Sequence, residues 1–157
     1  MTSVYDGASP GIRVPPPLVY LAGFACGLLG ELVAPSPGLA GWLRIGGAAA
    51  GIVLLLLLDT HAMLRFRRHG TPFNPARPAK ALVTDGPYRF TRNPMYLGMG
   101  CAYAGAALAA GALWSLALLP LVLLIVDRLI IPREEAHLAA SFGEEYERYR
   151  GRVRRWL

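Results

Sequence analysis

Apolar residues form three long runs along the chain, and polar residues gather between them. The runs cover about residues 18–34, 42–64 and 96–131. Stretches within them, such as 52–58 and 116–126, carry no charge and lack the polar face of a soluble helix. Uninterrupted apolar segments of this length are typical of helices that contact lipid. The pattern therefore predicts an integral membrane protein.

The third apolar run is too long for one membrane crossing. About 36 residues at a rise of ~1.5 Å give about 54 Å, against a hydrocarbon core of ~30 Å. We therefore expect a helical hairpin that turns near residues 111–115, with Pro120 kinking the second arm. With the two earlier runs, this gives four transmembrane helices.

The last segment has a different pattern, in which apolar residues recur every three or four positions from Pro132 onward. Charged residues occupy the opposite face, and Gly143 is a weak point. We expect an amphipathic helix that lies on the membrane surface or folds back over the bundle. The fold class is thus all-α, a polytopic membrane protein with a C-terminal amphipathic helix. Its apolar stripe consists of Leu138, Phe142, Tyr146, Tyr149, Val153 and Trp156.

The distribution of charge predicts the topology. The chain has 16 Lys and Arg residues and a net charge of +6, and only Arg44 falls in an expected outer loop. The positive-inside rule then places both termini and the central loop in the cytoplasm, with the protein in the cytoplasmic (inner) membrane. Nucleic-acid motifs are missing from the sequence, so we expect no nucleic-acid partner.

Cysteine and histidine residues do not predict a metal site. Cys26 and Cys101 lie in apolar runs without a CxxC spacing, and the three histidines are scattered. One of them, His61, stands near Asp59 at the end of the second run. This pair either faces a cavity or marks the point where the helix meets water, and the sequence leaves both open.

Two polar features flank the expected hairpin. Asn93-Pro94 directly precedes its first helix, whose free N–H groups would attract an anion. Glu134 and Glu135 lie at or near the apolar stripe of the last helix, where a carboxylate needs a cation. Each has a structural interpretation, as a helix cap or as ion pairs with Arg92 or Arg128. Together they suit a zwitterionic amino acid group, and Tyr88 and Tyr96 offer aromatic faces to a sulfonium.

The segment 82–98, LVTDGPYRFTRNPMYLG, resembles the signature of the isoprenylcysteine carboxyl methyltransferase and phospholipid methyltransferase superfamily. The spacing to Arg133-Glu134-Glu135 and then to residues 142–146 is similar as well. The resemblance implies S-adenosylmethionine as cofactor and a lipophilic, membrane-associated methyl acceptor. It also implies one domain over 1–157, with two N-terminal spans (1–64) and a catalytic core (65–157).

The resemblance carries specific residues into the cofactor pocket, and Glu134 would meet the cofactor's ammonium group. Arg92 would orient an acidic headgroup, and Glu135 or Asp127 would act as a base where the acceptor needs one. The family often has His at the position of Asn93, and eukaryotic members have Arg where this chain has Ile130. A prenylcysteine carboxylate is therefore not the expected acceptor. The implied pocket residues are Lys80, Ala81, Leu82, Val83, Tyr88, Asn93, Pro94, Met95 and Tyr96.

Two other functions remain open at this point. One is an NADPH-dependent membrane reductase related to the sterol reductases, which resemble this architecture in part. The other is a non-catalytic membrane assembly factor whose loop and tail dock a partner. Binding of S-adenosylmethionine distinguishes the three.

Overall fold

The computed structural model describes residues 14–70 and 81–157, and over these ranges it contains helices and no strand. Two long helices come first, α1 (Pro16–Val33) and α2 (Gly41–Arg68). After the short 3₁₀ helix η1 (Gly86–Arg89), the hairpin follows as α3 (Pro94–Ala110) and α4 (Leu113–Ile125). A π-helical turn, η2 (Val126–Ile130), leads into α5 (Ile131–Phe142), and α6 (Glu144–Arg150) is the last helix. The all-α prediction is confirmed.

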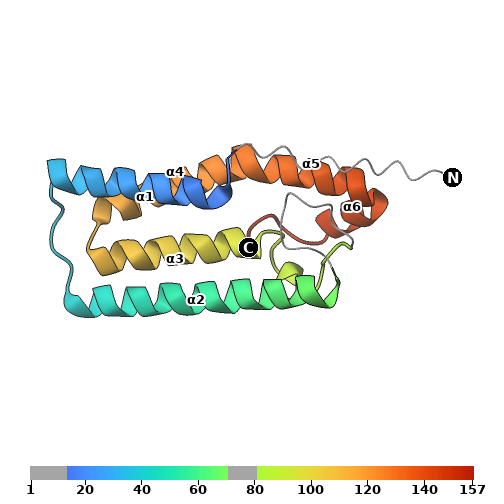
Figure 1. Cartoon of the computed structure of the whole chain (residues 1–157), viewed down its shortest axis with the longest axis horizontal. Helices are drawn as coiled ribbons and strands as arrows, with labels where there is room; N and C mark the ends of the chain where they lie inside the picture. The colour runs from blue at the N-terminus through green and yellow to red at the C-terminus, as the bar shows by residue number, and fades with distance from the viewer. Residues whose placement is uncertain (1–13, 71–80) are drawn as a thin grey trace.

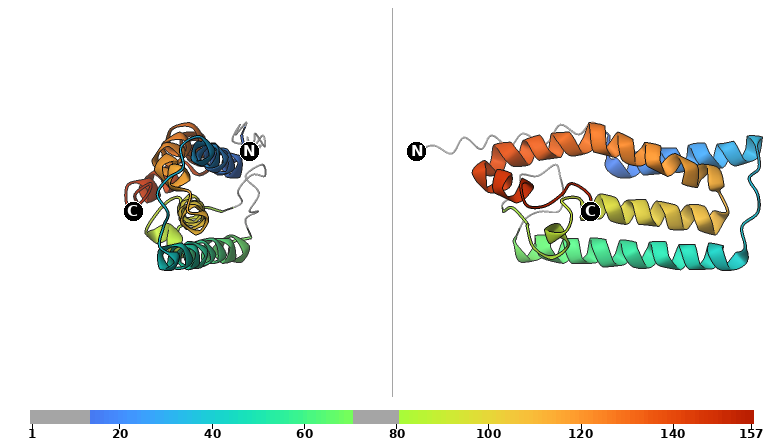
Figure 2. Two further views of the ribbon diagram at one scale, coloured as in Figure 1. Left: turned by 90° about the vertical axis from the view of Figure 1, so that its left-hand side faces the viewer. Right: turned by 180° about the vertical axis from the view of Figure 1, so that it is seen from behind.

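The helices run side by side in a bundle of three layers (Figure 1). α3 lies between α2 on one side and the α1/α4 pair on the other, and the end-on view in Figure 2 shows the same order. The predicted turn of the hairpin is confirmed at Gly111, which takes the left-handed conformation (φ 71°) that glycine favours. We call the end with this turn and the 34–40 loop the far end, and the opposite end the site end.

Three of the described helices are long and apolar enough to cross a membrane, not the four that we predicted. They are Pro16–Val33, Gly41–Arg68 and the continuous helical stretch Leu113–Phe142. The exception is α3, whose 17 residues span about 26 Å at ~1.5 Å per residue, less than a ~30 Å hydrocarbon core. The two arms of the hairpin differ in length. The second arm continues through the π-helical turn into α5, whereas α3 is limited to Pro94–Ala110.

Apolar side chains cover the outside of the bundle as well as its interior. Leu29, Leu32, Ile52 and Leu56 are all more than half exposed, which an aqueous surface would penalise but lipid would not. This outward apolar surface agrees with the membrane prediction.

Small residues let α2 and α3 approach closely. A Cβ atom on Gly51 would lie 2.7 Å from the Cys101 carbonyl oxygen, and one on Gly105 would lie 2.9 Å from the Gly47 carbonyl oxygen. Both approaches are too short for any side chain, so backbone packs on backbone here. Gly46, in contrast, faces open space.

The amphipathic helix predicted from Pro132 to Trp156 is wrong as one element. It breaks at Gly143, with φ 52° and ψ −126°, and helical structure stops after Arg150. The apolar stripe is nevertheless buried, because Leu138, Phe142 and Val153 pack with Tyr146 and Tyr149 in one core cluster. Of the two placements that we considered, folding back over the bundle is the one observed (Figure 1).

Candidate functional site

The residues after α6 form a strap, residues 151–157, that ties the start of α3 to α5. The backbone N–H of Arg92 donates to the Arg154 carbonyl at 3.0 Å. The Thr91 hydroxyl and the Asn93 side-chain amide both donate to the Arg155 carbonyl, at 3.0 Å and 2.9 Å. The strap therefore fixes the segment that leads into α3, and helical periodicity alone gave no sign of it.

Asn93 is the residue before the first turn of α3, but its side chain does not cap that helix. Its amide is used by the strap, and the helix start has no side-chain cap hydrogen bond. Pro94, the first residue of the helix, has no N–H, so the first N–H groups of the helix are those of Met95 and Tyr96. No described side chain therefore accepts from the N–H groups of this first turn, and the turn itself contains no acidic residue to compensate the positive end of the helix dipole.

Glu135 is held between two arginines. Its two oxygens accept from Arg155, at 3.1 Å and 2.7 Å, and the carboxylate also pairs with Arg92 at 3.0 Å. The hydrogen bond to Glu135 is the main reason that the pKa of Arg155 is raised above its usual value. Arg155 and Trp156 both donate to Asp127 as well, so the strap is fastened to η2. The interpretation of the acidic pair as an ion pair with Arg92 thus applies to Glu135, whereas Arg128, the other predicted partner, pairs with Asp127 instead.

Glu134 differs from its neighbour, because it forms no ion pair with a described residue. Its carboxylate accepts a hydrogen bond of 2.5 Å from the Tyr96 hydroxyl. Tyr96 is in the first turn of α3, and its carbonyl accepts from Tyr20 of α1 at 2.9 Å. This contact places a half-buried carboxylate directly beside the open helix N-terminus.

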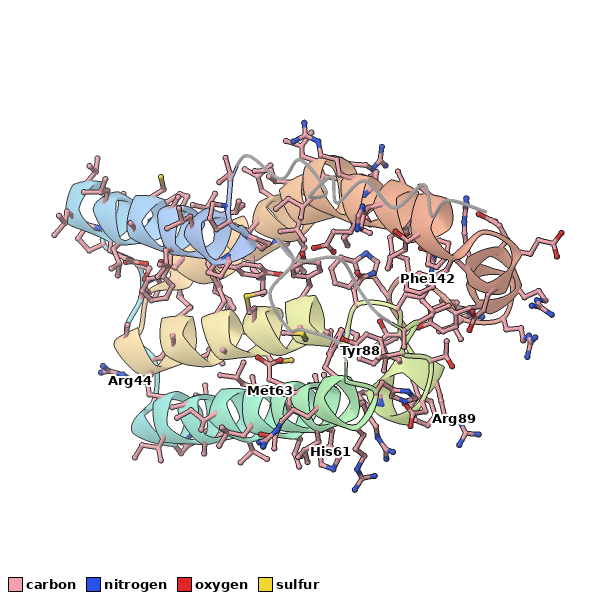
Figure 3. The ribbon with its side chains drawn as sticks, turned by 45° about the vertical axis from the view of Figure 1, so that its right-hand side comes forward. Arg44, His61, Met63, Tyr88, Arg89 and Phe142 are labelled. Atoms are coloured by element: carbon pink, nitrogen blue, oxygen red, sulfur yellow. The ribbon has the colours of Figure 1, made fainter. Side chains whose placement is uncertain are left out.

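Tyr88 lies between α2 and the C-terminal helices (Figure 3). Its ring meets Phe66 edge-on at 5.7 Å, and its carbonyl accepts from the Tyr149 hydroxyl at 2.8 Å. Burial is the main cause that raises its pKa, and smaller electrostatic contributions from Tyr149, Glu134 and Asp59 add to the effect. The phenol therefore stays protonated, and it lies within electrostatic reach of carboxylates from two helices.

The remaining expected pocket residues, 80–83, differ in how deeply they are buried. Val83 is buried in the core cluster with Tyr88, and Leu82 packs against it. Ala81 is partly buried, and Lys80 lies outside the described residues. The structure thus brings Leu82, Val83, Tyr88, Asn93–Tyr96 and Glu134 to one end of the bundle.

Asp59 is a site-end residue that the sequence did not assign. A Cβ atom on Gly98 of α3 would lie 2.7 Å from its Oδ1, so the carboxylate lies against α3. His61 is exposed and points away from the bundle, with its Nδ1 2.7 Å from the Leu57 carbonyl (Figure 3). The pair that the sequence left open is therefore split, with Asp59 facing inward and His61 outward.

The family model described as phospholipid methyltransferase matches residues 43–145, which include all but the first two residues of α2, the whole hairpin and the acidic pair. An uncharacterized protein of Haemophilus influenzae is 50% identical over 34 residues, 22% of this chain and 54% of that protein. The chain thus spans about half the length of that relative. No solved structure gives a significant match.

The family match is to a family of methyltransferases, and three of the described helices are long and apolar enough to cross a membrane. Among the described residues, no three His, Cys, Asp or Glu side chains are grouped to hold a metal ion. The match covers about two thirds of the sequence and contains the motifs on which the resemblance rests. The chain belongs to the phospholipid methyltransferase family.

Proposed function

We propose that the protein transfers a methyl group from S-adenosylmethionine to a lipophilic acceptor in the membrane. The observation that carries the proposal is the hydrogen bond of 2.5 Å between Glu134 and Tyr96. It joins a carboxylate without a described cationic partner to the first turn of an uncapped helix. A site for a cation and a site for an anion are therefore adjacent, as an amino acid zwitterion requires.

Each end of that zwitterion has a partner of suitable chemistry. The N–H groups in the first turn of α3 suit a carboxylate, because no described side chain accepts from them and the helix dipole is positive there. Glu134 suits an ammonium group, because a half-buried carboxylate without a cation is costly. The ring of Tyr88 suits a sulfonium. These residues fit the cofactor, which supplies a methyl group bound to a positively charged sulfur.

Transfer of that methyl group needs alignment more than acid or base assistance. The strap supplies rigidity, since it fixes residues 91–93 to α5 by hydrogen bonds and ion pairs. Glu135 has both oxygens occupied by guanidinium groups, so accepting a proton would break an ion pair. We therefore propose Glu135 and Arg92 as positioning residues, and not as a base and a headgroup anchor.

The site end is proposed to face the cytoplasm, where S-adenosylmethionine is made. The described arginines other than Arg44 lie at this end or on the helices that lead to it, while Arg44 lies near the far end (Figure 3). That distribution agrees with the positive-inside rule for a protein of the cytoplasmic membrane.

Calorimetric titration of the purified protein in detergent tests the proposal. We expect S-adenosylmethionine to bind with a stoichiometry near one, and NADPH, the cofactor of the reductase alternative, to give no heat beyond dilution. Binding of NADPH alone would favour the reductase, and binding of neither would favour the non-catalytic assembly factor.

A further inference from the structure

Two segments that lie outside the family match both bind the start of α3. The match covers residues 43–145, so it includes neither α1 (Pro16–Val33) nor the strap. The strap binds the segment that leads into α3, through the hydrogen bonds made by residues 91–93. Helix α1 binds the first turn of α3 itself, through the side chain of Tyr20. The start of α3 is therefore held by two parts of the chain for which the family match implies no role.

The Tyr20 hydroxyl is a buried hydrogen-bond donor on α1. The residue is only 6% exposed, and its hydroxyl donates to the Tyr96 carbonyl at 2.9 Å. A carbonyl inside an α-helix can accept from the backbone N–H four residues later, so this carbonyl does not depend on Tyr20 for a partner. The hydroxyl therefore adds a connection between α1 and α3 that α3 does not need for its own hydrogen bonding.

Tyr96 extends this connection to the carboxylate of the proposed cofactor site. Its carbonyl accepts from Tyr20, and its own hydroxyl donates to Glu134 at 2.5 Å. Two hydrogen bonds thus link α1 to α3 and α3 to α5. Because both bonds involve the same buried residue, fixing the backbone of Tyr96 against α1 also fixes the phenol that binds Glu134.

The separation between Glu134 and the start of α3 matters for the ligand that we propose. An amino acid carries its ammonium and its carboxylate on one carbon atom, so the protein groups that bind them must be held at a matching distance. Binding and catalytic groups work best when neighbouring residues lock them in place, and a small displacement is costly. A residue that fixes Tyr96 therefore controls how well both ends of the zwitterion are bound at once.

We propose that Tyr20 is a positioning residue for the amino acid end of the cofactor and that it acts through Tyr96 on Glu134. The inference rests on the proposed function, in which Glu134 binds the ammonium group. It assigns to α1 a part in ligand binding, in addition to its part in crossing the membrane.

Tyr103 offers a matched control within the same core cluster. It is 5% exposed, and its hydroxyl donates to the Ser115 carbonyl at 2.8 Å. Ser115 lies near the start of α4, toward the far end of the bundle. Tyr20→Phe and Tyr103→Phe therefore remove the same kind of buried hydrogen bond by the same substitution, but only Tyr20→Phe affects a residue of the site.

Titration of full-length protein in detergent with two probes tests the proposal: S-adenosylmethionine and methylthioadenosine, which lacks the amino acid group. We expect Tyr20→Phe to bind S-adenosylmethionine about three- to tenfold more weakly than the wild-type protein, the effect of losing one neutral hydrogen bond. The same variant should bind methylthioadenosine within about twofold of the wild-type affinity, because this probe has no group for Glu134. Tyr103→Phe should bind both probes within about twofold of the wild-type affinity.

A double-mutant cycle tests whether Tyr20 acts through Tyr96. Tyr96→Phe already lacks the hydroxyl that binds Glu134, so adding Tyr20→Phe should weaken S-adenosylmethionine binding by less than about twofold more. If Tyr20→Phe does not fold, Tyr20→Met removes the hydroxyl with a flexible side chain that can fill the space, and the same selective loss is expected. Equal affinities of the Tyr20 and Tyr103 variants, additive losses in the cycle, or a parallel loss of methylthioadenosine binding would overturn the proposal.

The wild-type titration separates this inference from the proposed function. If the wild-type protein does not bind S-adenosylmethionine, the proposed function fails and the positioning role fails with it. If the wild-type protein binds it and folded Tyr20→Phe binds it equally well, the inference fails and the function stands. Thermal unfolding supplies the structural control, because Tyr20→Phe and Tyr103→Phe each lose one buried hydrogen bond and should be destabilised to a similar extent.

Discussion

The two ends of the bundle each contain a carboxylate near the start of a hairpin helix, and the two carboxylates are bound differently. At the far end, Glu31 accepts from the backbone N–H groups of Ser36 and Trp114, at 2.8 Å and 2.9 Å, and from the Ser36 hydroxyl. At the site end, Glu134 accepts one hydrogen bond, from Tyr96. Glu31 is thus fully used in closing the loop onto α4, which is a structural role.

The helix starts differ in the same way. The start of α4 at the far end receives a carboxylate from Glu31, whereas the start of α3 at the site end receives none from the described residues. At the far end the protein completes its own helix N-terminus. At the site end the helix N-terminus and the Glu134 carboxylate lie side by side, but the carboxylate does not accept from the helix N–H groups, which is how a binding site differs from a structural contact.

The largest loss of stability is expected from a substitution in the contact between α2 and α3, which both ends of the bundle depend on. Gly51→Leu inserts a side chain where a Cβ atom already lies 2.7 Å from the Cys101 carbonyl oxygen. Since α2 and α3 cannot separate without losing their contact, we expect the folded protein to be lost, with an unfolding cost of at least about 3 kcal/mol. Size-exclusion profiles in detergent check this, and Gly46→Leu, which faces open space, is the matched control. A monodisperse Gly51→Leu variant with wild-type melting would contradict the helix packing.

The second-largest loss of stability is expected at the site end alone, because only that end is held by the strap. Arg155→Met leaves Glu135 and Asp127 each with one guanidinium partner fewer. We expect a loss of about 2–3 kcal/mol, less than for a fully buried pair since Arg155 is partly exposed. Thermal unfolding in detergent measures it, and Arg148→Met, on the exposed side of α6, should change little. Equal melting temperatures for the two variants would mean that the strap contributes no stability.

Much of this arrangement was predictable from sequence, because apolar runs report lipid contact directly. The apolar runs located the first two helices, although α2 continues four residues beyond the predicted end at Leu64, and the hairpin turn also agrees with its prediction. The strap was not predicted, because Val153 and Trp156 keep a helical spacing while packing in a non-helical segment. Its stability comes from ion pairs between residues far apart in sequence, which no local pattern encodes. The inward orientation of Asp59 likewise depends on where α3 packs.

A smaller effect is expected at Asn93, where the family often has His. The Asn93 amide donates to the Arg155 carbonyl, and an imidazole N–H can replace that donor. Asn93→His should therefore change the cofactor affinity by less than about 1 kcal/mol, whereas Asn93→Leu removes the donor and should cost about 1–2 kcal/mol of stability. Calorimetry and thermal unfolding of both variants provide the check. Equal behaviour of the His and Leu variants would show that the hydrogen bond to the strap is unimportant.

The orientation of the two ends is testable without any change in stability. A reporter that is active only outside the cytoplasm should be silent when fused after Leu157 and active when inserted near Ser36. We expect this because the arginines gather at the site end. The reverse pattern would place the site away from its cofactor.

The central claim is that Glu134 binds the cofactor while Glu31 only closes a loop, and one calorimetric comparison tests it directly. S-adenosylmethionine is titrated into Glu134→Gln and into Glu31→Gln, after circular dichroism has established that both are folded. We expect Glu134→Gln to lose about 2–5 kcal/mol of binding free energy, the range for removing one partner of a buried charge pair, and Glu31→Gln to bind as the wild-type protein does. Wild-type affinity in folded Glu134→Gln would contradict the account, because the acidic pair would then be a structural feature of α5 alone.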